Sequence, residues 1–248
     1  QMSEAALDFR WIGKRTIRPD GVDKVTGRAT FGADFALPEM LFGRVLRSPH
    51  AHARIISIDT SKAEALPGVK AVITAADFPE IPAEDATKGT APANFVHLSD
   101  NIMARKKTLY DGHSVAAVAA TSAGIARRAV ALIEVEYEVL PHVIDVDAAM
   151  AADAPLLHEK MITGGVEPKP TAPSNVSRRH EFTIGDIEAG FAAANVVIER
   201  EFTTQPVHQG YIEPHAVVAD ANERDQIKIW CSSQGHFMVR QFTAGLLN

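Results

Sequence analysis

The stretch Val115-Ala-Ala-Val-Ala-Ala120, followed by Ser122 to Leu132 and then by Ile133-Glu-Val-Glu-Tyr-Glu-Val139, decides the fold class. Its first part is a short apolar run typical of a buried strand, and its middle has a helix-forming composition. The last part alternates apolar and acidic residues, which predicts a strand with one buried face. This strand–helix–strand order lacks a phosphate-cradling glycine loop. It therefore predicts a mixed α/β (α+β) fold and argues against a dinucleotide-binding sheet.

The residues before this stretch predict three further strands, at 41–46, 53–58 and 69–74, from their branched side chains and their Gly and Pro boundaries. A short helix is expected at 60–66, ended by Pro67-Gly68. Thr60 or Ser61 is expected to cap it, with Glu64 completing a capping box three residues after Ser61.

Residues 151–178 change in character, because paired glycines and three prolines break any regular element. This segment is expected to be a linker or wrapping arm. Beyond it, strands are expected at 180–184, 195–202, 216–219 and 227–231, and helices at 186–194 and from about residue 236. Such a small unit of about 70 residues is expected to need a partner surface for stability.

Composition excludes several classes of protein. The chain has 248 residues, 46% of them hydrophobic and 23% charged, which indicates a globular protein. Its net charge of −6 gives no basic surface for nucleic acid, and no apolar run approaches the roughly 20 residues that cross a bilayer. The N-terminus does not resemble a secretory signal. One cysteine, Cys231, excludes an internal disulfide or a cysteine-ligated iron–sulfur cluster and favours a cytoplasmic location.

Several phrases in order resemble the hammerhead domain in the large subunit of the xanthine dehydrogenase and aldehyde oxidase family, the molybdenum hydroxylases. They are Asp23-Lys-Val-Thr-Gly-Arg-Ala29, Pro38-Glu-Met-Leu41, Arg47-Ser-Pro-His-Ala-His-Ala-Arg-Ile55, Leu66-Pro-Gly-Val-Lys-Ala-Val72 and Glu134-Val-Glu-Tyr-Glu-Val-Leu-Pro141. One departure is Tyr110-Asp-Gly-His-Ser-Val115, where the family usually has Gly-Glu-Pro before the valine. The resemblance implies a hammerhead domain over 13–150 and a linker over 151–178.

Residues 179–248 resemble an incomplete N-terminal part of the family's molybdopterin-binding domain. The matching phrases are Ile184-Gly-Asp-Ile-Glu-Ala-Gly-Phe191, Val196-Val-Ile-Glu-Arg-Glu-Phe202 and His208-Gln-Gly-Tyr-Ile-Glu-Pro-His215. Gln234 aligns with the glutamine that, in this family, hydrogen-bonds an oxo ligand of molybdenum, and Gly235 follows it as a second candidate for cofactor binding. The family's glycine-rich loop and catalytic glutamate are absent, so no catalytic residue is expected in this chain.

The resemblance implies part of a molybdenum-dependent oxidoreductase that hydroxylates an aldehyde or N-heterocyclic carbon of a small molecule. Its molybdenum–molybdopterin cofactor would be shared with a C-terminal molybdopterin-binding polypeptide. Electrons would pass to an iron–sulfur subunit and to FAD on a flavoprotein subunit. The isolated chain is expected to be inactive and to hold no metal. The alternative is a non-catalytic assembly module that retains the hammerhead fold.

Other polar residues have simpler interpretations. Gln234 is alternatively the cap of the helix that follows it. Glu213 is expected to anchor a loop, and Cys231 to fill the core. Two histidine pairs have spacings that invite a zinc interpretation, but an ordered loop and a hydrogen-bonded interface are favoured for them. These pairs are His50 with His52, and His208 with His215.

Overall fold

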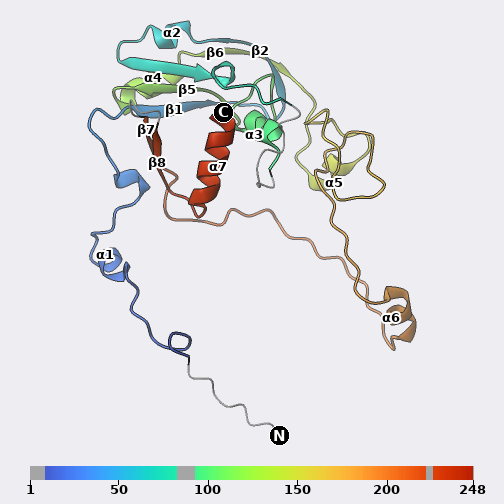
Figure 1. Cartoon of the computed structure of the whole chain (residues 1–248). Helices are drawn as coiled ribbons and strands as arrows, with labels where there is room; N and C mark the ends of the chain where they lie inside the picture. The colour runs from blue at the N-terminus through green and yellow to red at the C-terminus, as the bar shows by residue number, and fades with distance from the viewer. Residues whose placement is uncertain (1–8, 83–92, 222–225, 248) are drawn as a thin grey trace. The chain divides into compact units, whose positions relative to one another are not determined.

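The computed structural model describes residues 9–82, 93–221 and 226–247, which form two compact units (Figure 1). The first unit comprises the chain up to Pro38 together with Val207–Gln234. The second comprises Glu39–Pro206 together with Gly235–Asn248. Within the described residues, no helix combines the length and the apolar character that crossing a membrane requires.

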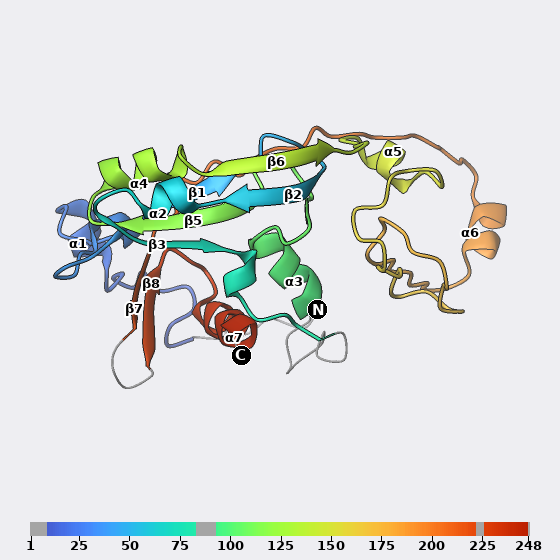
Figure 2. The ribbon, with the colours of Figure 1, turned by 90° about the horizontal axis from the view of Figure 1, so that it is seen from above.

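Two three-stranded antiparallel sheets form the centre of the second unit (Figure 2). The first has β5 (Ser114–Ala120) between β1 (Phe42–Arg47) and β3 (Val69–Thr74). The second has β2 (Ala53–Asp59) between β4 (Lys107–Thr108) and β6 (Glu134–Val139). The predicted strand–helix–strand stretch is therefore confirmed, and its two strands enter different sheets. Mixed helices and antiparallel sheets establish the α+β class.

Small side chains set the packing of this core. The helix α4 (Ala123–Val130) lies on β5, and their contact faces consist largely of alanine. The buried cluster contains Ala63, Ala116, Val118, Ala120, Ala126, Ala129 and Ile133. Alanine faces let the helix axis approach the sheet closely, so that short side chains still exclude water. Ser122 caps α4 by accepting a hydrogen bond from the Ile125 amide at 3.2 Å.

The short helix α2 (Ser61–Glu64) forms as expected, but its predicted capping box is wrong. Thr60 is the N-cap residue, and its hydroxyl donates to the Glu64 carboxylate at 2.6 Å instead of accepting from the helix. The Ser61 amide donates to the Asp59 carboxylate at 2.9 Å. The last residue of β2 therefore satisfies a first-turn amide that the sequence pattern assigned to the helix itself.

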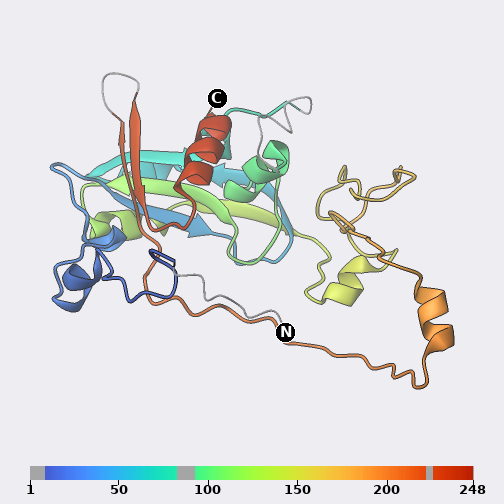
Figure 3. The ribbon, with the colours of Figure 1, turned by 60° about the horizontal axis from the view of Figure 1, so that its bottom comes forward.

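A second helical layer pairs α3 (Phe95–Ile102) with α7 (His236–Leu247), which lie side by side in Figures 1 to 3. The Phe95 ring is 1% exposed and meets the Phe242 ring edge-on, with centroids 6.1 Å apart. Gly245 makes this approach possible, because a Cβ at that position would lie 2.5 Å from the Phe95 ring. The 3₁₀ turn η2 (Ala75–Asp77) follows β3 and adjoins this layer.

The segment from 143 to 206 has little regular structure. It contains α5 (Val146–Met150) and α6 (Ile187–Ala193), and residues 161–179 fold back on themselves through paired backbone hydrogen bonds. Strands predicted at 180–184 and 195–202 are not formed, because neither segment has a hydrogen-bonded partner among the described residues. Ile184 is 90% exposed and Phe202 85% exposed, and Figure 3 shows this part as an extended trace.

The first unit is smaller and is built on one antiparallel strand pair. β7 (Val217–Ala221) pairs with β8 (Ile227–Cys231), which confirms both predicted strands to within two residues. The turn η1 (Gly32–Asp34) lies against β7, and a short helix α1 (Gly21–Val25) precedes it. Phe35 stacks on Trp230 with ring centroids 4.6 Å apart, which joins the early residues to β8.

Candidate functional site

The end of β8 is fixed by hydrogen bonds that centre on Ser232. The Ser232 amide donates to the Ala216 carbonyl at 3.1 Å, and the Ala216 amide donates to Ser232 Oγ at 3.0 Å. This exchange extends the pairing of β7 and β8 by one residue beyond Cys231. The chain that follows, Ser233-Gln234, therefore begins from a defined point.

The Gln234 side chain is exposed and makes no hydrogen bond to a described residue. In particular, it does not accept from a first-turn amide of α7, so the helix-cap alternative has no support in this structure. Its carboxamide has two N–H donors and one carbonyl acceptor, and all of them are available to a partner outside the described residues.

Gly235 precedes α7, and neither its φ nor a close contact with a described residue requires a glycine there. Its φ lies outside the left-handed region, and a Cβ would meet only Met238 atoms, at 3.5 to 3.7 Å. These are ordinary van der Waals distances. Because glycine has no side chain, the backbone at Gly235 can come close to a bound group.

Glu213 and Cys231 were assigned structural roles from the sequence. The Gly32 amide donates to the Glu213 carboxylate at 3.3 Å, so this carboxylate anchors the chain before β7 to η1, as expected. Cys231 is half-buried on β8, whereas a fully buried core position was expected. A two-stranded sheet leaves the end of its strand partly open, which explains the difference.

Neither histidine pair belongs to a group of three or more metal-ligating side chains among the described residues. His52 is buried, and its Nδ1 lies 2.7 Å from the Pro141 carbonyl, while His50 meets the Tyr137 ring edge-on. The second pair, His208 and His215, flanks the Tyr211 ring, with centroid distances of 4.8 and 4.6 Å. The favoured packing and hydrogen-bonding roles fit these contacts.

A histidine cluster that the sequence analysis missed lies in the second unit. His97 and Asp100 on α3 meet His158, which follows α5 by eight residues. All three are half-buried, and one ligand atom from each lies within 4.8 Å of the others. The i, i+3 spacing of His97 and Asp100 was the available signal. Their partner lies 58 residues further along the chain in an irregular segment, which no local pattern connects to α3.

Burial lowers the pKa of His158 below its ordinary value, and unfavourable electrostatic interactions with the basic residues His97, Lys107 and His113 add to this effect. The negative charge of Asp100 opposes it. The neutral imidazole is therefore favoured at neutral pH.

His113 is a second buried histidine that the sequence did not single out. Its Nδ1 accepts from the Leu109 amide at 3.1 Å, and its Nε2 lies 3.2 Å from the Asn101 carbonyl. This arrangement fits a neutral ring that is protonated on Nε2. Burial lowers the pKa of His113, because a second ring proton would point at the Leu109 amide in a desolvated site. The residue fixes the turn before β5.

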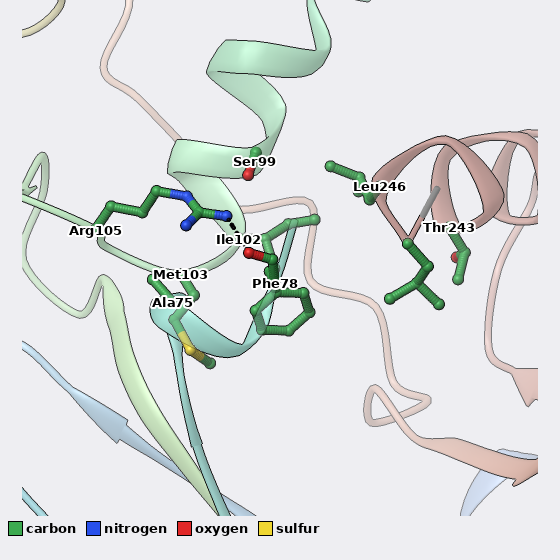
Figure 4. Close-up of a pocket in the computed structure, with 9 residues that line it drawn as sticks. Ala75, Phe78, Ser99, Ile102, Met103, Arg105, Thr243 and Leu246 are labelled. Carbon is green, nitrogen blue, oxygen red and sulfur yellow. Dashed lines mark hydrogen bonds between the residues drawn. The ribbon is translucent and has the colours of Figure 1, made fainter. Parts of the chain in front are cut away.

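A pocket of about 210 Å³ lies between α3, η2 and α7 (Figure 4). Arg105 supplies the one charged side chain among its lining residues, and it donates to the carbonyls of Phe78 and Pro79 at 2.9 and 2.7 Å. The remaining lining residues are Ala75, Phe78, Ser99, Ile102, Met103, Thr243, Leu246 and Leu247. An apolar wall with an occupied guanidinium offers no acid–base pair, so this pocket is not the candidate site.

Comparison with known proteins defines the class. Residues 26–141 match the aldehyde oxidase and xanthine dehydrogenase a/b hammerhead domain, and residues 144–248 match a molybdopterin cofactor-binding domain. The chain belongs to the xanthine dehydrogenase and aldehyde oxidase family of molybdenum hydroxylases and matches part of its large subunit. The expected fold, a hammerhead domain followed by molybdopterin-binding sequence, is confirmed.

Individual relatives catalyse different oxidations, as their names state. The chain is 36% identical to the carbon monoxide dehydrogenase large chain of Afipia carboxidovorans, over 96% of this chain and 29% of that protein. It is 34% identical to a probable hypoxanthine oxidase of Escherichia coli O157:H7, over 97% of this chain and 27% of the relative. The chain therefore spans less than a third of the length of these two relatives.

Solved structures agree on the fold. A crystal structure of Cu,Mo-CO dehydrogenase superposes with a TM-score of 0.70 at 35% identity, over 94% of this chain and 29% of that one. Quinoline 2-oxidoreductase from Pseudomonas putida 86 superposes with a TM-score of 0.68 at 30% identity, over 94% of this chain and 28% of its own.

Proposed function

We propose that this chain is part of the molybdopterin-binding subunit of a molybdenum-dependent oxidoreductase that hydroxylates a small molecule. An aldehyde or the carbon of an N-heterocycle is the proposed substrate class. The names of the relatives include oxidases of both kinds, together with carbon monoxide dehydrogenases. We propose the same domain boundaries as the resemblance implied, namely a hammerhead domain over 13–150, a linker over 151–178 and molybdopterin-binding sequence over 179–248.

The observation that carries the proposal is that the carboxamide of Gln234, three residues beyond β8, makes no hydrogen bond to a described residue. An N–H of this amide is suited to donate to an anionic oxygen of a bound cofactor. Ser232 fixes the strand end two residues earlier, and Gly235 leaves the backbone bare one residue later. These features fit a residue that orients a molybdenum–molybdopterin cofactor without ligating its metal.

The bound cofactor would supply the redox chemistry, whereas this chain would supply orientation. Gln234 would hold one oxygen of the cofactor by hydrogen bonding, and the Gly235 backbone would admit the cofactor edge. The remaining contacts are assigned to a C-terminal molybdopterin-binding polypeptide. An iron–sulfur subunit and an FAD-containing flavoprotein are the proposed electron acceptors. A cytoplasmic location is proposed, and the single cysteine supports it.

The test compares Gln234→Ala with Gln226→Ala in the assembled enzyme. Gln226 is an exposed glutamine that directly precedes β8, so it controls for loss of an exposed amide near the other end of this strand. A charge-assisted hydrogen bond contributes about 1.5–3 kcal/mol, so turnover of Gln234→Ala should fall by roughly 10- to 150-fold. Molybdenum content should be retained. Turnover equal to that of Gln226→Ala would show that the amide has no role.

Gly235→Ala provides an independent arm of this test. The added Cβ makes only ordinary contacts with Met238, so thermal stability of the chain should change little. Reduced cofactor content or turnover at unchanged stability would locate the bound group beside Gly235. Unchanged content and turnover would remove Gly235 from the site.

A second candidate function is a non-catalytic assembly module. The exposed apolar segments at 180–184 and 195–202 favour it, because they are extended and have no hydrogen-bonded neighbour among the described residues, so another polypeptide can pair with them. Mixing the chain with its partner polypeptides separates the two functions. Gain of molybdenum and substrate-dependent dye reduction supports the enzyme, whereas a stable complex with neither supports assembly alone.

A further inference from the structure

The side chains of His97, Asp100 and His158 form a cluster that the proposed oxidoreductase function does not use. His97 and Asp100 project from the same side of α3 because they are three residues apart. The rings of His97 and His158 lie 4.4 Å apart between centroids, at an angle of 58°. The nearest ligand atoms of the three residues lie within 4.8 Å of one another.

One ring nitrogen of His97 is buried without a hydrogen-bond partner among the described residues. His97 Nδ1 is buried and makes no hydrogen bond. An orphaned buried ring nitrogen costs free energy unless something binds it. Since His97 belongs to the same cluster as a second imidazole and a carboxylate, a cation is a ligand that fits this set of side chains.

The backbone around the cluster is held in place from both sides. Asn94 caps α3 by accepting from the Val96 and His97 amides at 3.0 and 3.2 Å. On the other side, Lys107 of β4 donates to the Leu156 carbonyl at 3.3 Å and pairs with Glu159 at 3.1 Å. These two contacts bracket His158. The His158 ring is therefore presented to α3 by a segment that is tied to the sheet.

We propose that His97, Asp100 and His158 bind a divalent transition metal ion, Zn²⁺, with a water molecule in the fourth position. Two imidazoles and one carboxylate are ligands that Zn²⁺ accepts, and bond lengths near 2.0–2.2 Å place tetrahedral ligand atoms about 3.4 Å apart. Closing the cluster from its present spacing requires side-chain shifts of about 1 Å. The charge of Lys107 is offset by Glu159, so it does not stand alone beside the ion.

The role of this ion would be structural. It would join α3, in the hammerhead part of the chain, to the segment after α5 that leads toward the molybdopterin-binding sequence. The site is independent of Gln234 and of the molybdenum cofactor. A zinc site would contradict the sequence-based expectation that the isolated chain holds no metal, and the titration below distinguishes the two.

The test titrates the purified 248-residue chain with Zn²⁺ alone, in competition with a chromophoric chelator. Wild type should bind one equivalent with a dissociation constant in the micromolar range or below. His158→Ala and the isosteric Asp100→Asn should each weaken binding at least about 10-fold, because each removes a ligand. His142→Ala, an exposed histidine of the same unit, should bind like wild type.

A second measurement keeps the proposal testable if a variant folds poorly. Zn²⁺ should raise the thermal midpoint of wild type and His142→Ala but not that of Asp100→Asn, because a ligand of the native state stabilises it. Asp100→Asn should retain the circular dichroism of wild type. Binding that Asp100→Asn leaves unchanged, or the absence of a zinc-dependent shift in wild type, would overturn the proposal.

Discussion

Replacing Gly68 with alanine should destabilise the chain strongly, for two reasons that the structure separates. Gly68 has φ +95°, a conformation that costs an alanine about 1–2 kcal/mol. Its Cβ would also lie 2.6 Å from Ile125 Cδ1 and 2.9 Å from Thr121 Oγ1. Ile125 is half-buried and packs against the core cluster, so relieving the clash would move its terminal methyl out of that packing. Such overpacking costs about 1–3 kcal/mol.

Gly112 provides the matched control. It has a similar φ of +84°, but a Cβ there would meet nothing within 4 Å. Gly112→Ala therefore reports the conformational cost alone. Alanine also restricts the unfolded chain, which offsets about 0.4–1 kcal/mol in both variants. The net expected losses are about 2–4 kcal/mol for Gly68→Ala and about 1 kcal/mol for Gly112→Ala.

Urea denaturation of the two variants and wild type measures both losses, read from the midpoint at a constant m-value. Circular dichroism at zero denaturant establishes that each variant is folded. Equal losses for the two glycine variants would refute the steric part of the reasoning. No loss for Gly112→Ala would refute the conformational part.

Three further predictions follow from the second unit. Phe95→Ala should lower the free energy of unfolding by about 3–5 kcal/mol, because the ring is almost fully buried between α3 and α7; a loss below about 1 kcal/mol would mean that α7 does not dock. Ser122→Ala should cost about 1 kcal/mol through loss of the α4 cap, measured by the same denaturation and contradicted by an unchanged midpoint. The unfolding midpoint should also fall as the pH drops below about 6.5, the ordinary value for histidine. Burial lowers the pKa of His113 in the folded chain, so the unfolded chain binds more protons in that range, and stability is retained above it. A pH-independent midpoint from about 7.5 to 5 would show that His113 does not titrate in this way.

Local patterns predicted the hammerhead strands because each is specified by its own residues. The strand at 69–74 has the predicted bounds, and the alternation at 134–139 places Val135 and Tyr137 on the more buried face. Segments 180–184 and 195–202 have equally strong strand composition but remain extended. A strand requires a hydrogen-bonded neighbour, and composition alone does not provide one.

For the candidate functional residues too, the sequence indicated those in local motifs and missed those that depend on distant contacts. Gln234 was predicted as a site residue because it follows a predictable strand and a family motif, and it stays a prediction. The cluster of His97, Asp100 and His158 was not found, since its members come from a helix and a distant irregular segment. His113 was passed over as part of a turn, although it is fully buried.

By itself, the sequence determined the α+β class, most strand positions of the hammerhead unit and the family, because hydrophobic period, turn residues and ordered motifs are local properties. Tertiary structure alone decided which strands pair, that Asp59 supplies the first-turn contact of α2, and that His158 reaches α3. Each of these depends on residues brought together by burial of a shared core, and the separation of partners along the chain hides such contacts from any local pattern.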